Sequence, residues 1–163
     1  SPAPAIRNYE FWEESLFSEL RREPGSYEIK DPSLLSRIEW SGADLFFVKS
    51  EDTNYPAWNQ DYLFLNGDFT ISYTMPKIIQ GKYKVFLGAH AFSQDNALVE
   101  IFLDNKKIGG LVDLTTGGNS SYPYGRKEIG TVEFQRYEDH TIRVVSLIPG
   151  AFMWDYVRFE PVK

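Results

Sequence analysis

The stretch Lys82–Ala89, KYKVFLGA, decides the fold class because apolar residues recur in it at every second position. Tyr83, Val85 and Leu87 follow this period, which is that of a β-strand burying one face. Eight further pieces of strand length alternate or run apolar: Leu34–Trp40, Asp44–Lys49, Phe69–Tyr73, Ala97–Leu103, Lys107–Val112, Ile129–Phe134, Thr141–Leu147 and Asp155–Phe159.

Short polar clusters such as LNGD, DNKK, TTGGNSS and RYED stand between these pieces and are typical of turns. Short strands joined by polar turns, without helices between them, predict an all-β fold, an antiparallel β-sandwich or jelly roll. The sequence contains no repeat with a period of about 20 to 50 residues, which excludes solenoids and propellers.

One helical pattern precedes the strands. Apolar residues recur there at spacings of three and four and form one face: Tyr9, Trp12, Leu16 and Leu20. We therefore predict a short helix within residues 8–25, a linker or cloning boundary in residues 1–7, and a β-jelly-roll domain in residues 26–163.

Charge and composition exclude several classes of function. The 163 residues, enough for one domain, include 17 basic and 23 acidic side chains, and the net charge of -6 disfavours nucleic acid as a partner. No apolar run is long enough for a bilayer, so we expect no direct membrane insertion. The absence of Cys excludes thiolate nucleophiles and Cys-type zinc sites.

Motifs of catalysis are also missing. No G-x-S-x-G or phosphate-binding glycine loop is present, and His90 and His140 are 50 residues apart without a metal-binding spacing. The sequence therefore predicts a protein that is not an enzyme.

Four segments resemble carbohydrate-binding modules of families 6 and 35. Gly67–Ala91 is similar to their paired "G-D-W" and "G-x-Y" strands, with Phe69 at the tryptophan position. Residues 97–118 resemble their "v-x-l-D-g" hairpin and Thr-Gly loop, residues 130–145 their penultimate hairpin, and residues 153–162 their terminal strand. The segments occur in matching order over roughly Ser33–Val162.

The resemblance implies a galactose-binding-like β-jelly roll. With its "EFW" beginning and "FEPV" ending, the chain looks most like non-catalytic C-terminal modules of surface lipoproteins from the Bacteroides group, including those attached to fasciclin domains. It implies a module of a larger secreted or lipid-anchored protein, located outside the cell or on its outer surface. The implied partner is a glycan, and no cofactor is required.

Aromatic residues are abundant, with 4 Trp, 10 Tyr and 12 Phe. Strand period and the resemblance together assign most of them to packing, among them Phe69, Tyr83, Phe86, Phe102, Phe134, Trp154 and Phe159. Four rings remain, in the polar loops Ser50–Asp61 and Thr115–Glu128. Sugars offer C–H faces to aromatic rings and hydroxyls to polar groups. The predicted carbohydrate-binding residues are therefore Tyr55, Trp58, Asn59, Asn119, Tyr122 and Tyr124.

An alternative function follows from Met153, which occupies the position of a hydrogen-bonding Asn in the related modules. It favours an interaction or spacer module that has lost sugar binding and contacts a neighbouring domain or protein.

The resemblance also implies a structural calcium ion. Asp155 matches an acidic residue that helps to hold calcium in many related modules, and Glu39 is the early acidic residue placed similarly. Calcium needs six to eight oxygen ligands, and these two residues supply only part of such a set. The alternative is that Asp155 caps the final turn.

Overall fold

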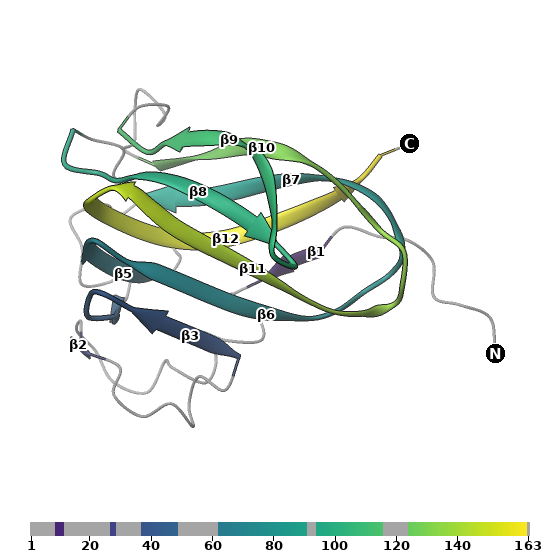
Figure 1. Cartoon of the computed structure of the whole chain (residues 1–163), viewed down its shortest axis with the longest axis horizontal. Helices are drawn as coiled ribbons and strands as arrows, with labels where there is room; N and C mark the ends of the chain where they lie inside the picture. The colour runs from purple at the N-terminus through teal and green to yellow at the C-terminus, as the bar shows by residue number, and fades with distance from the viewer. Residues whose placement is uncertain are drawn as a thin grey trace.

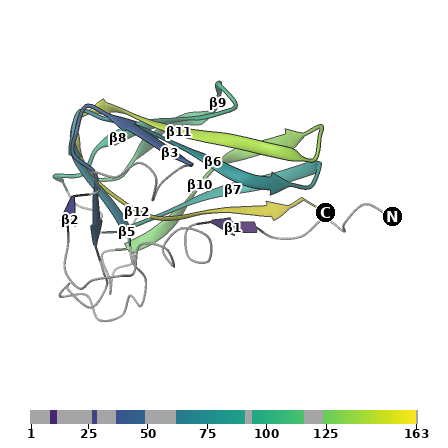
Figure 2. The same ribbon diagram turned by 90° about the horizontal axis from the view of Figure 1, so that it is seen from below.

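The computed structural model describes residues 9–11, 27–28, 37–48, 62–90, 94–115 and 124–162. In these residues β-strands form two antiparallel sheets, one of seven strands and one of five, which pack face to face (Figures 1 and 2). This confirms the predicted β-sandwich. No helix in the described ranges is long and apolar enough to cross a membrane.

The larger sheet, which we call sheet A, has the order β10-β7-β12-β5-β4-β2, and β1 also pairs with β12. Its strands are β1 (Tyr9–Phe11), β2 (Tyr27–Glu28), β4 (Phe46–Val48), β5 (Tyr62–Gly67), β7 (Gly81–His90), β10 (Tyr124–Phe134) and β12 (Gly150–Pro161). Trp154 of β12 pairs with both β7 and β5, while Val157 pairs with β7 and β1. One edge of β12 therefore pairs with β7. The other edge pairs with β5 in the first part of the strand and with β1 in the second part.

The smaller sheet, sheet B, has the order β3-β6-β11-β8-β9. Its strands are β3 (Ile38–Ser41), β6 (Thr70–Ile78), β8 (Leu98–Leu103), β9 (Lys106–Asp113) and β11 (Glu138–Ile148). Strands β9 and β10 are the edge strands of the two sheets on the same side of the sandwich, at the top of Figure 1.

Side chains of alternate residues fill the space between the sheets. In β7, Tyr83, Val85 and Leu87 are fully buried and the intervening lysines are exposed, as the sequence predicts. Among the seven rings assigned to packing, five are buried. Phe86 and Phe102 are half-buried instead, and the guanidinium of Arg143 lies 4.6 Å from the centroid of the Phe102 ring.

Several strands differ from the prediction: β1, β2 and β5 were not predicted, and β6, β10 and β12 extend beyond their predicted bounds. Residues 9–11, predicted as the beginning of a helix, form β1, because the edge of β12 beyond β5 offers them pairing partners. The rest of the predicted helix lies outside the described residues. Strand β5 was not predicted, because its run of four apolar residues beginning at Tyr62 shows no alternation. Strand β10 begins at Tyr124, five residues before the predicted Ile129.

Candidate functional site

The predicted ligand-binding residues belong to two segments that join sheet A. Tyr55, Trp58, Asn59, Asn119 and Tyr122 lie outside the described residues. Tyr124, predicted in a loop, is the first residue of β10, and its backbone pairs with His90 of β7. The second aromatic segment is therefore shorter than expected and ends in a strand.

Both segments begin or end beside one row of residues that runs across sheet A. In this row Gly125 pairs with Ala89, Ala89 with Trp154, Trp154 with Leu63, and Leu63 with Phe47. Residues 49–61 leave the sheet between Val48 and Tyr62, and residues 116–123 reach it at Tyr124. Gly125 and Leu63 are three strand spacings apart, about 14 Å. The points where the two segments join sheet A are therefore about three strands apart.

Trp154 lies in the middle of this row and is fully buried, which confirms its assignment to the core. Its ring stacks on Phe152, with 5.5 Å between the ring centroids. Two stacked, buried aromatic rings therefore form the core beneath this row.

Met153 lies on the outer face of sheet A, directly beside this row. It pairs with Phe64, which pairs with Phe46, and all three side chains are half-buried. The rings of Phe46 and Phe64 have centroids 6.3 Å apart. These three side chains therefore form an apolar row, which can pack against a flat apolar partner but offers no side-chain hydrogen bond.

Asp113 fixes the backbone where the second segment begins. Its Oδ1 accepts hydrogen bonds from the Thr115 hydroxyl at 2.5 Å and the Thr115 N–H at 2.8 Å. These bonds, with a smaller contribution from the charge of Lys127, hold the pKa of Asp113 below its ordinary value. The Lys127 ammonium donates to the Asp113 carbonyl, and burial lowers the pKa of Lys127 although Asp113 opposes this shift. The backbone at Asp113 and Thr115, directly before residues 116–123, is thus held by hydrogen bonds.

The two positions predicted to hold calcium belong to different sheets. Glu39 lies on β3 of sheet B, where it is exposed between buried Ile38 and half-buried Trp40, so it points away from sheet A. Asp155 lies on β12 of sheet A, at a register shift between Trp154 and Tyr156. Glu39 and Asp155 thus lie on different sheets, and the calcium site stays a prediction. The described residues contain no group of three or more His or acidic side chains that could hold a metal ion.

His140 is buried and has defined partners. It is 4% exposed, its Nδ1 lies 2.5 Å from Oδ2 of Asp104, and its ring stacks on Phe134 with 3.9 Å between the ring centroids. These contacts indicate a structural role.

No protein-family model and no curated protein matches the sequence. Solved structures do match. The fold is similar to part of the xanthan lyase of Paenibacillus, with a TM-score of 0.64 and 12% identity, over 99% of this chain and 14% of that chain. It is also similar to the family 35 carbohydrate-binding module of Paenibacillus barcinonensis (TM-score 0.55, 16% identity, 84% of this chain and 98% of that chain). The family 35 module of Clostridium thermocellum gives a TM-score of 0.52 at 14% identity, over 86% of this chain and 99% of that chain.

The chain thus matches whole modules nearly end to end but spans only about a seventh of the lyase. The two packed antiparallel sheets of this chain therefore have the fold of the family 35 carbohydrate-binding modules that it matches.

Proposed function

We propose that this chain is a non-catalytic carbohydrate-binding module that recognises a poly- or oligosaccharide through the rings of residues 49–61 and 116–123. One observation carries the proposal: both segments, whose sequences contain aromatic and amide side chains, attach beside a single row of sheet A about 14 Å long. That length suits a ligand of several sugar units. The likeness in fold to family 35 carbohydrate-binding modules supports the same function.

The direct test is a binding screen of the purified chain against a panel of oligosaccharides and polysaccharides. Trp58→Ala and Tyr122→Ala remove rings that we expect to stack on sugar, and each should weaken binding by roughly tenfold or more. Tyr137→Ala is the matched control, because Tyr137 is an exposed ring in the turn between β10 and β11, away from both segments. Absence of binding, or equal binding by all variants, would contradict the proposal.

The alternative is an interaction module that contacts a neighbouring domain. The apolar row of Met153, Phe64 and Phe46 favours it, as does the likeness to a part of a much longer lyase. In the full-length protein, Met153→Lys should then loosen the contact between this module and its neighbour, detected as more rapid proteolysis between them. If the wild type and Met153→Lys are cleaved at the same rate, the module does not make such a contact.

For location, we propose that the chain acts outside the cell or on the outer surface, as a module of a larger secreted or lipid-anchored protein. Protease treatment of intact cells should then digest the module, and protection until lysis would contradict this location.

A further inference from the structure

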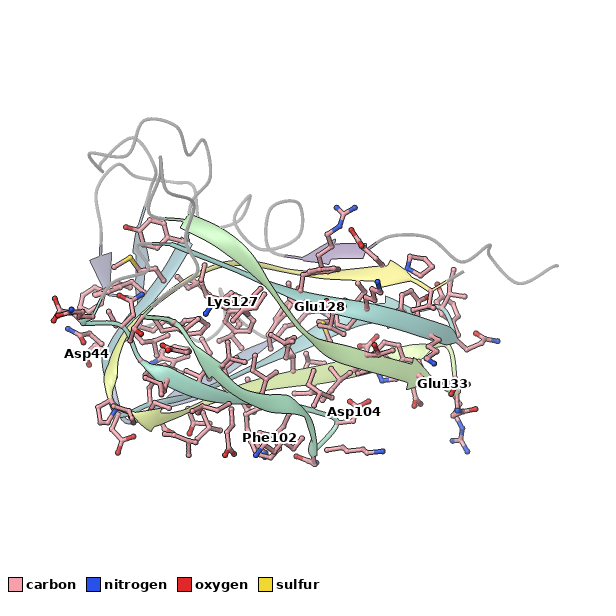
Figure 3. All side chains as sticks on the ribbon, turned by 90° about the horizontal axis from the view of Figure 1, so that it is seen from above. Asp44, Phe102, Asp104, Lys127, Glu128 and Glu133 are labelled. Carbon is pink, nitrogen blue, oxygen red and sulfur yellow. The ribbon has the colours of Figure 1, made fainter. Side chains whose placement is uncertain are left out.

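A cleft of about 510 Å³ opens between edge strands β9 and β10. At one end the two strands touch: a Cβ on Gly109 would lie 1.9 Å from the Ile129 carbonyl oxygen, and Gly109 has a φ of +63°. Beyond this contact the strands diverge toward the β8–β9 turn and the end of β10. In Figure 3 Asp104 and Glu133 lie toward this same end, with Lys127 farther back along β10. The cleft is therefore formed by the two sheets and not by the segments discussed above.

The floor of the cleft is apolar and its rim is polar. Leu103, Ile108 and Phe134 are buried in the floor beside half-buried Val132. The rim carries six exposed polar side chains: Asp104, Lys106, Lys107, Thr131, Glu133 and Gln135. In the described part of the chain, β9 pairs only with β8 and β10 only with β7, so the backbone of both strands also faces the cleft unpaired. Such a combination of an apolar floor and convergent hydrogen-bonding groups is typical of small-molecule sites of this size.

The charges of the cleft select a neutral ligand. Lys107 pairs with Glu100 at 3.2 Å, and Asp104 with His140 at 2.5 Å. Among the described residues, no ion pair or side-chain hydrogen bond involves Lys106 or Glu133, which stand on opposite strands of the cleft. The lining therefore has two charges of each sign, and its one unpaired ammonium and one unpaired carboxylate offer a donor and an acceptor, which suits hydroxyls rather than an anion or a cation.

We propose that this cleft binds a neutral sugar unit, with a C–H face on Val132 and Ile108 and hydroxyls between Lys106 and Glu133. It is a second site, because β10 separates Gly125 from Thr131 by six residues, about 20 Å. The inference depends on the proposed function only for the class of ligand, and its test distinguishes the two sites.

Nuclear magnetic resonance titration of the ¹⁵N-labelled chain tests the cleft directly. The probes are neutral mono- to tetrasaccharides of glucose, galactose, mannose and xylose. We expect amide shifts at Lys106, Gly109 and Thr131–Gln135. Lys106→Ala and Glu133→Gln should each weaken this binding about tenfold or more, and Thr131→Trp, which fills the cleft from its exposed rim, should abolish it. The controls are Lys84→Ala and Glu138→Gln, exposed charges outside the cleft lining that should leave affinity unchanged.

The same titration separates failure here from failure of the proposed function. Shifts confined to residues beside the aromatic segments, such as Tyr62 and Thr115, and lost in Trp58→Ala, would overturn the cleft and support the proposed function. Shifts confined to the cleft that persist in Trp58→Ala and Tyr122→Ala would support the cleft site and contradict the proposed function. Absence of shifts with every probe, or shifts at Lys106 that survive Thr131→Trp, overturns the cleft site.

Discussion

The Nδ1 atom of His140 lies 2.5 Å from Oδ2 of Asp104, so a buried histidine of β11 holds the turn between β8 and β9. Because a carboxylate only accepts hydrogen bonds, Nδ1 carries the hydrogen. Oδ1 of Asp104 accepts a second bond, from the Thr141 N–H at 2.9 Å. Asp104 has a φ of 50°, a left-handed conformation that Asp and Asn tolerate better than most residues.

We predict that Asp104→Ala destabilises the protein by about 2 to 3 kcal/mol, because it leaves two donors without an acceptor and places alanine in a left-handed turn. Asp104→Asn keeps one acceptor and the turn conformation, and should cost clearly less. Urea denaturation of the two variants measures the difference. Equal losses would mean that the hydrogen bonds to His140 and Thr141 contribute little.

A second prediction concerns the contact between the two sheet edges. Gly109→Ala should destabilise the protein by about 3 kcal/mol, because its Cβ would overlap the Ile129 carbonyl and the residue has a positive φ. Gly110→Ala is the matched control, since a Cβ there meets no atom within 4 Å and should change stability by less than about 0.5 kcal/mol. Thermal denaturation compares the two, and similar melting temperatures would contradict the contact.

A third prediction follows from the lowered pKa of Asp113. Its folded-state pKa lies below the unfolded value of about 3.9, so its hydrogen bonds with Thr115 stabilise the folded state above that pH. The stabilisation is lost as the pH falls through the folded-state pKa. Thr115→Val removes the hydroxyl donor and should therefore lose less stability than the wild type between pH 5 and pH 2.5.

Urea midpoints at several pH values test this prediction. Thr131→Val serves as the control, because the Thr131 side chain has no hydrogen bond to a carboxylate among the described residues. If Thr115→Val and the wild type show the same dependence on pH, the Thr115 hydroxyl does not set the pKa of Asp113.

The fourth prediction concerns calcium. Because Glu39 is exposed on the outer face of sheet B, Glu39→Gln should change the free energy of unfolding by less than about 0.5 kcal/mol, with or without calcium. Melting curves in calcium and in chelator check this. A loss of stability in Glu39→Gln that occurs only in calcium would indicate that Glu39 is a calcium ligand.

Alternation made most of the sandwich predictable. In β7 the buried Tyr83 and Val85 stand beside Lys82 and Lys84, and in β8 burial alternates along the strand, so both strands are nearly where the sequence places them. β5 could not be predicted this way, because Leu63 and Leu65 face the core while Phe64, between them, is also half-buried on the outer face. Apolar residues on both faces remove the period of two.

The candidate site was less predictable than the fold. Tyr124 follows a segment rich in Gly, Ser and Pro, yet its backbone pairs with His90, a partner 34 residues away that local sequence does not reveal. The cleft between β9 and β10 had no sequence signal at all. Lys106 and Glu133 belong to different sheets, and only the approach of the two edges at Gly109 brings their strands together.

The place of β12 affects how the chain can be synthesised and folded. β7, β5 and β1 all form hydrogen bonds with β12, which is made after every one of them. On the ribosome, outer pairs such as β3–β6 and β8–β9 can form from strands already emerged, whereas the centres of both sheets stay open until Glu138–Ile148 and Gly150–Pro161 have left the exit tunnel. Nascent chains of this protein should therefore depend on chaperones until translation passes β12, and stalling just before it should leave them sensitive to protease.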